Sequence, residues 1–131
     1  MKIDQVSEQG IECLVDEFYK RIRVDQKLAP IFSRAISGDW DPHLATMRDF
    51  WSSVMLTSGR YKGNPVAKHL KLEGMAPHLF DRWLKLFAET CHELFEDTLA
   101  NAFAAKAEHI AESLKIALFY RPDRPWPDKM S

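Results

Sequence analysis

The sequence has few cysteines, almost no net charge and no long apolar run. Its two cysteines, Cys13 and Cys91, each lie among apolar positions of an expected helix, so we expect two reduced core thiols rather than a disulfide or a redox pair. The 18 basic and 19 acidic residues nearly balance, which gives no electrostatic reason to expect a nucleic acid or an anionic membrane as partner. No stretch approaches the ~18 consecutive apolar residues of a membrane span.

The two ends of the chain suggest neither a targeting segment nor a second domain. No apolar run follows the first five residues, so a secretory signal is not expected, and we predict a cytoplasmic protein. A length of 131 residues suits one domain, which we place at residues 1–120. Residues 121–131 contain three prolines and many charges and form an expected tail without a fold of its own.

Apolar residues recur at spacings of three and four along most of the chain, which predicts an all-α fold. Asp41-Pro42 and Asn64-Pro65 mark two helix starts, because Asp and Asn are good N-caps and Pro fits the first helical position. The segment from Leu28 to Phe32 is expected to form one tight turn that packs Phe32 inward. The expected helices start after Asp4 or Ser7, at Asp41, at Asn64, at Pro77 and at Asp97 or Thr98, and end near Arg23, Thr57, Leu72, Glu96 and Phe119.

Aromatic side chains are more numerous than a small helical bundle needs, with eight Phe, four Trp and three Tyr. Many fall on the expected inner helix faces: Phe18, Phe32, Phe50, Trp51, Phe80, Trp83 and Phe87. Either the core is simply dense in aromatic packing, or aromatic walls enclose a flat apolar cofactor. The sequence contains no glycine-rich phosphate loop, nucleophile elbow, paired-histidine metalloprotease helix or metal-binding cysteine pair.

His69 is a candidate metal ligand on a short expected helix. A helix from Asn64 to about Leu72 is too short to be stable alone. A metal bond from His69 would hold it, and so would ordinary packing of Val66 and Leu70. Zinc held by His69 and Glu73 would have only two protein ligands, fewer than zinc sites use.

Two further side chains have polar groups whose role the residue pattern leaves open. Tyr19 follows Phe18 at the edge of a buried stripe, so its hydroxyl either reaches solvent or needs a buried partner. His43 lies in the first turn of an expected helix, on the same face as Met47. An exposed histidine is the commoner case at such a position.

The ordered set of these residues resembles the truncated haemoglobins, and most closely their third group. The resemblance covers about residues 3–119. The first group has paired glycines in the loops that flank its first helix, and this sequence lacks them, as the third group does. The motifs that carry the resemblance are Phe18-Tyr19, Phe32, Trp40-x-x-His43, Phe50-Trp51, Tyr61-x-Gly63-x-Pro65-x-x-x-His69-Leu70 and Trp83-Leu84-Lys85-Leu86-Phe87.

The resemblance implies a globin-like, truncated two-on-two helical sandwich around haem b. It makes His69 the iron ligand, Tyr19 and Trp83 the donors to a distal ligand, and His43 a distal residue that controls ligand access. Phe18 would line the distal side, and Trp51 would pack behind the pocket. The remaining residues implied to contact the cofactor are Phe32, Met47, Phe50, Tyr61, Val66, Leu70 and Phe87.

The implied function is binding of dioxygen and other small diatomic ligands (NO, CO) at a five-coordinate iron in a bacterial-type, monomeric globin. Two distal donors favour slow dioxygen release, which suits ligand chemistry or sensing better than oxygen delivery. NO dioxygenase or peroxidase-like turnover would need an electron donor, so an unidentified reductase is a further expected partner. The alternative from another class is a cofactor-free helical interaction module with an aromatic core. A sensor would need a separate output partner.

Overall fold

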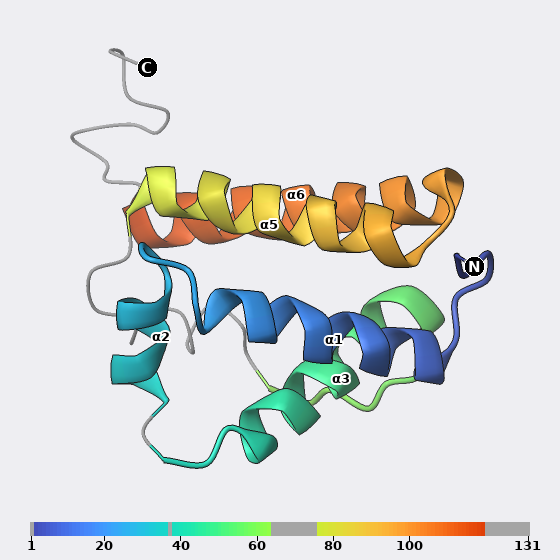
Figure 1. Ribbon diagram of the computed structural model, residues 1–131, viewed down its shortest axis with the longest axis horizontal. Helices are drawn as coiled ribbons and strands as arrows, with labels where there is room; N and C mark the ends of the chain where they lie inside the picture. The colour runs from blue at the N-terminus through green and yellow to red at the C-terminus, as the bar shows by residue number, and fades with distance from the viewer. Residues whose placement is uncertain (1, 37, 64–75, 120–131) are drawn as a thin grey trace.

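The protein is described by a computed structural model that covers residues 2–36, 38–63 and 76–119 (Figure 1). The expected helix from Asn64 to Leu72, which includes Val66, His69 and Leu70, lies outside the described residues, as does the tail 121–131. The described helices are α1 (Glu8–Ile22), α2 (Ala29–Ala35), α3 (Asp41–Leu56), α5 (Pro77–Leu94) and α6 (Asp97–Phe119).

The helices form two packed pairs. Helices α5 and α6 run side by side in opposite directions, and α1 packs against both α5 and α3, so the α5–α6 pair covers the α1–α3 pair (Figure 1). The predicted all-α, two-on-two arrangement is confirmed. Helix α2 lies at one side of this sandwich and buries Ile31 and Phe32.

Local signals explain the N-terminal end of the sandwich. The Ser7 hydroxyl accepts a hydrogen bond from the Gly10 N–H at 3.0 Å, which caps α1. Ile3 forms an isolated parallel β-bridge with Phe95: its N–H donates to the Leu94 carbonyl at 2.9 Å, and its carbonyl accepts from Glu96 at 2.8 Å. The segment before α1 is therefore fixed to the joint between α5 and α6.

Two local predictions were wrong. Helix α2 is longer than the single turn expected, because Pro30 lies in the first helical turn, where its missing N–H has no intrahelical partner. The residue that precedes α3 is Trp40, so Asp41 is the first helical residue and not the N-cap. The carboxylate of Asp39 accepts from the Asp41 N–H at 3.0 Å and takes over the capping role.

The two cysteines have different environments. Burial raises the pKa of the Cys91 thiol to about 12, so this cysteine is the inert core thiol that was predicted. Cys13 is exposed, which corrects the prediction that it lies in the core. It is two residues from the buried Ile11 and therefore points to the opposite side of α1.

The core is built from stacked aromatic rings that join α3, α5 and α6. Trp51 is 2% exposed and stacks on Phe87 with ring centroids 4.9 Å apart. Phe87 stacks in turn on Trp83 at 5.4 Å, while Trp51 contacts Phe103 at 5.9 Å. Trp51 thus fixes α3 against the other pair of helices.

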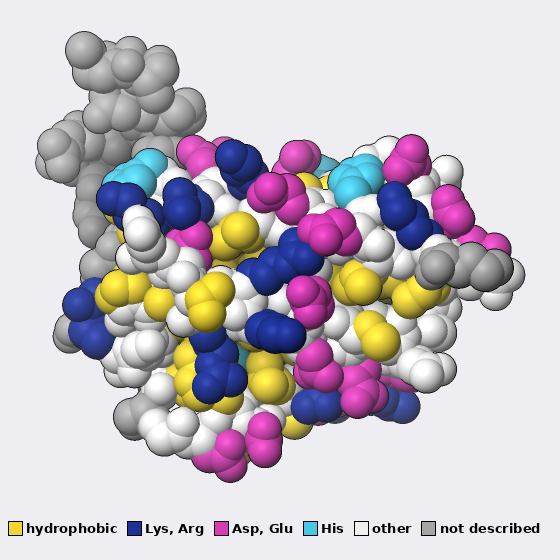
Figure 2. All heavy atoms as spheres, in the orientation of Figure 1, with side chains coloured by type: hydrophobic (Ala, Val, Ile, Leu, Met, Phe, Trp, Pro, Cys, Tyr) yellow, Lys and Arg dark blue, Asp and Glu magenta, His cyan; other side chains and the backbone are white. Residues whose placement is uncertain are grey.

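The surface carries both signs of charge. Figure 2 shows acidic and basic side chains interspersed over the visible face. In the described part of the chain, no helix has the length and apolar content needed to cross a membrane.

Candidate functional site

Four of the predicted distal residues lie in one continuous row of rings. His43 contacts Tyr19 with ring centroids 5.0 Å apart, Tyr19 contacts Phe18 at 5.1 Å, and Phe18 contacts Trp83 at 5.3 Å. All three contacts are edge-to-face, the geometry that aromatic quadrupoles favour. Helices α1, α3 and α5, which are far apart in sequence, each contribute at least one ring to this row.

Tyr19 lies at the centre of the row and is 4% exposed. Phe32 of α2 also contacts its ring, with centroids 6.1 Å apart. Burial raises the pKa of the Tyr19 phenol well above its ordinary range, because an apolar environment disfavours the phenolate. Among the described residues, no hydrogen bond involves the Tyr19 hydroxyl. The side chain is therefore a neutral donor in a desolvated position.

His43 lies in the first turn of α3, as predicted, but its ring turns inward. Its side chain is half-buried, and its Nε2 atom is inaccessible to solvent. The ring packs edge-to-face on Tyr19, and also on Trp40 with centroids 5.8 Å apart. The alternative, an ordinary exposed histidine in a first helical turn, does not describe this side chain.

Trp40 and Arg23 belong to this site, and sequence reasoning missed their contact. The Arg23 guanidinium carbon lies 4.9 Å from the Trp40 ring centroid, a cation–π geometry. Arg23 is the C-cap that follows α1, and Trp40 precedes α3. Nothing in the sequence indicates that these two helix ends meet, although the Trp40-x-x-His43 spacing did place Trp40 near His43.

The other residues predicted to line the cofactor pocket fall into two groups, one buried and one partly exposed. Phe32 and Phe87 are 5% and 1% exposed, so surrounding protein already covers them. Met47, Phe50 and Trp83 pack against the core but stay partly exposed. These three apolar side chains come from α3 and α5 and can contact a flat apolar group.

Tyr61 is positioned from α3. Its backbone N–H donates to the Ser53 hydroxyl at 2.8 Å, and its ring lies edge-to-face on Phe50 with centroids 5.2 Å apart. Burial raises the pKa of its phenol. The loop that carries Tyr61 therefore has both a polar and an apolar attachment to α3.

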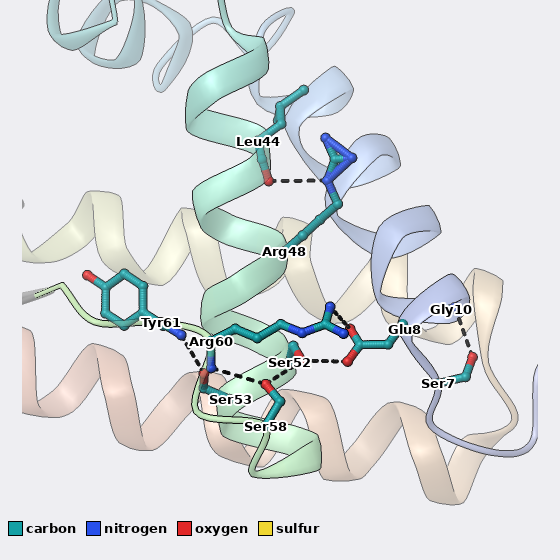
Figure 3. A network of polar contacts seen from close by, with 10 residues as sticks. All are labelled: Ser7, Glu8, Gly10, Leu44, Arg48, Ser52, Ser53, Ser58, Arg60 and Tyr61. Carbon is teal, nitrogen blue, oxygen red and sulfur yellow. Dashed lines mark hydrogen bonds and ion pairs between the residues drawn. The ribbon is translucent and has the colours of Figure 1, made fainter.

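A polar cluster fixes the start of the same loop to α1 (Figure 3). The fully buried Ser52 lies 2.7 Å, oxygen to oxygen, from the Glu8 carboxylate and from the Ser58 hydroxyl. Arg60 pairs with the other Glu8 oxygen at 3.3 Å. In Figure 3, dashed lines join the Glu8 carboxylate to both Ser52 and Arg60. Sequence reasoning did not find this cluster, because Glu8 lies 44 residues before Ser52 in the chain.

The predicted iron ligand His69 and its neighbours Val66 and Leu70 lie outside the described residues, so their predicted contacts stay predictions. Within residues 2–36, 38–63 and 76–119, no group of three or more His, Cys, Asp or Glu side chains is arranged to hold a metal ion.

Comparisons with known proteins find relatives that align with almost the whole chain. A curated protein described as group 3 truncated hemoglobin, from Campylobacter jejuni subsp. jejuni serotype O:2, is 33% identical over 122 residues, which is 91% of this chain and 96% of that protein. A crystal structure of group III truncated hemoglobin from Campylobacter jejuni superposes with a TM-score of 0.86 at 34% identity, covering 91% of this chain and 96% of that one. No family model matches the sequence.

Proposed function

Because this chain belongs to the group III truncated haemoglobins, we propose that it binds haem b non-covalently and, through it, dioxygen and other small diatomic ligands. The observation that supports this most is the row from His43 through Tyr19 and Phe18 to Trp83. It places a buried neutral phenol among apolar rings, which is the environment of a polar donor beside a small ligand.

The described residues fit a haem group. Met47, Phe50 and Trp83 offer partly exposed apolar surface beside the core, as the wall of a flat apolar cofactor must. The sequence has no Cys-x-x-Cys-His, so thioether links to the protein are not expected. His69 is the proposed axial ligand, and its other ring nitrogen is proposed to donate to a backbone carbonyl, which fixes the tautomer.

Haem supplies an iron that binds dioxygen reversibly, with negative charge shifted toward the ligand. The Tyr19 hydroxyl and the Trp83 indole N–H are proposed to donate hydrogen bonds to the ligand from two sides. Both donors come from packed helices, so little reorganisation is needed when a ligand arrives. His43 is proposed to control access, because its ring is held at the edge of the row rather than at its centre.

Finer points of this function stay predictions. They include five-coordinate iron, NO dioxygenase or peroxidase-like turnover, and the reductase that such turnover requires. The monomeric state, the cytoplasmic location and the domain limits at residues 1–120 are also predictions. The competing interaction module has no specific observation in its favour.

The experiment that tests the proposal is titration of the purified apoprotein with hemin, followed by an absorption spectrum. We expect a Soret band that saturates at one haem per chain and shifts on reduction and addition of carbon monoxide. Acid acetone should extract the haem completely. A chain that folds but never saturates with haem would instead support the cofactor-free interaction module.

A further inference from the structure

We propose that Arg23 and Trp40 form a latch that holds the His43 ring inward and so limits the rate at which ligands reach the distal site. This inference rests on the proposed haem function. It assigns a role to two residues that lie outside the row of distal rings.

Tyr19 and Arg23, at the C-terminal end of α1, face Trp40 and His43, at the start of α3. Arg23 follows Tyr19 by one turn, and its N–H donates to the Tyr19 carbonyl at 3.0 Å, so both side chains lie on the same side of α1. Trp40 and His43 are three residues apart and share a side of α3. The ring centroids of Tyr19 and Trp40 are 6.4 Å apart.

The rings of Tyr19, Trp40 and His43 contact one another, and Arg23 contacts Trp40. His43 touches both Tyr19, with ring centroids 5.0 Å apart, and Trp40, at 5.8 Å. Arg23 covers Trp40 with its guanidinium carbon 4.9 Å from the ring centroid. For His43 to swing outward, its ring must leave the edge-to-face contact with Trp40.

Arg23 acts through Trp40 and not on the ligand. Arg23 is exposed, Trp40 and His43 are partly buried, and Tyr19 is buried, so the set extends from solvent to the distal site. Trp40 precedes the first helical residue of α3. Its cation–π contact with Arg23 restricts the movement of its ring. Without that contact, the Trp40 ring gains freedom, and the inward position of His43 loses support.

The test is the rate of carbon monoxide association after flash photolysis of the reduced holoprotein. Arg23→Met removes the cation and keeps an unbranched side chain, and it should raise the association rate by about two- to fivefold, the effect of losing one exposed cation–π contact. Dioxygen dissociation should rise by no more than the same factor, because a ligand leaves by the path it enters and the donors Tyr19 and Trp83 are intact. Arg23→Lys keeps a cation over the ring and should restore most of the slow association.

Lys20→Met is the matched control, because Lys20 is an exposed cation of the same helix. Carbon monoxide is neutral, so loss of surface charge alone should not change its association rate. If Lys20→Met raises the carbon monoxide association rate as much as Arg23→Met does, the latch proposal is wrong.

The decisive comparison is made in a His43→Ala background. His43→Ala alone should accelerate association more than it changes dissociation, and adding Arg23→Met should then change nothing further. If Arg23→Met accelerates association equally with and without His43, it acts by another route and the latch is wrong.

Failure of the latch is distinguishable from failure of the proposed function. If His43→Ala accelerates association and Arg23→Met does not, the latch is excluded while ligand binding at a haem stands. If neither variant changes the rate, His43 does not control access and the latch is excluded with it. If the wild-type chain takes up no haem, the proposed function itself fails, and the latch fails with it.

Discussion

Replacing Tyr19 with phenylalanine removes one hydroxyl and leaves the ring that four neighbouring rings contact. Those neighbours are Phe18, Phe32, Trp40 and His43. Within the described residues the hydroxyl has no hydrogen bond to lose, and the side chain is 4% exposed. The apoprotein of Tyr19→Phe should therefore unfold at the wild-type temperature or slightly above it.

The effect on bound dioxygen should be large. Burial keeps water away from the donor, and dioxygen carries negative charge when it is bound to ferrous haem. A hydrogen bond to a charged group contributes roughly 1.5–3 kcal/mol, so dioxygen dissociation should accelerate by about tenfold to hundredfold. Because burial raises the pKa of the phenol, the donor stays protonated, and this factor should be constant between about pH 6 and pH 9.

The assay is stopped-flow replacement of dioxygen by carbon monoxide. Carbon monoxide dissociation, measured by replacement with nitric oxide, serves as the control and should change much less because that ligand is less polar. Trp83 or His43 can take over as donor in the single variant. The sharper comparison is therefore Tyr19→Phe combined with Trp83→Phe. If that double variant releases dioxygen at the wild-type rate, the two aromatics are ordinary core residues.

Two predictions concern stability rather than ligand binding. Trp51→Ala removes a 2%-exposed ring that stacks on Phe87. In urea denaturation of the apoprotein, this change should lower the free energy of unfolding by about 3–5 kcal/mol. The control is Val24→Ala at an 81%-exposed position, which should change the free energy of unfolding by less than about 0.5 kcal/mol. The Arg82 guanidinium donates two 2.7 Å hydrogen bonds to the Asp25 carboxylate and lowers the pKa of Asp25. Since this pKa is lower in the folded than in the unfolded protein, the ionised carboxylate stabilises the fold above about pH 4. This stabilisation is lost as pH falls through the folded pKa. The stability difference between wild type and Asp25→Asn should accordingly be constant above about pH 5 and shrink at lower pH. A difference for Asp25→Asn that stays the same at lower pH would contradict this, and the exposed Asp16→Asn is the matched control.

Helices and their faces were predictable because they depend on local spacing. The stripe of Ile11, Leu14, Phe18 and Ile22 is fully buried, and α6 runs from Asp97 to Phe119 as expected. The same periodicity, applied to Cys13, would have placed that thiol on the solvent side of α1.

The contacts between helices were not predictable from local patterns. The approach of Arg23 to Trp40 and of Ser52 to Glu8 depends on how α1 crosses α3. Tyr19, His43 and Trp83 were found because the order of aromatic and histidine residues resembles a family, and the structure places them in one row. Burial of the His43 ring depends on Tyr19 and Trp40 and could not be inferred from its position in a first helical turn.

The central claim is that one histidine, His69, binds the iron of a haem group, and His69→Gly with added imidazole tests it most directly. Glycine removes the ligand and leaves space for a free imidazole. We predict that the reduced variant loses the wild-type absorption spectrum and regains it when imidazole is added, while His78→Ala, His92→Ala and His109→Ala keep it throughout. A His69→Gly protein with an unchanged spectrum in the absence of imidazole would contradict the claim.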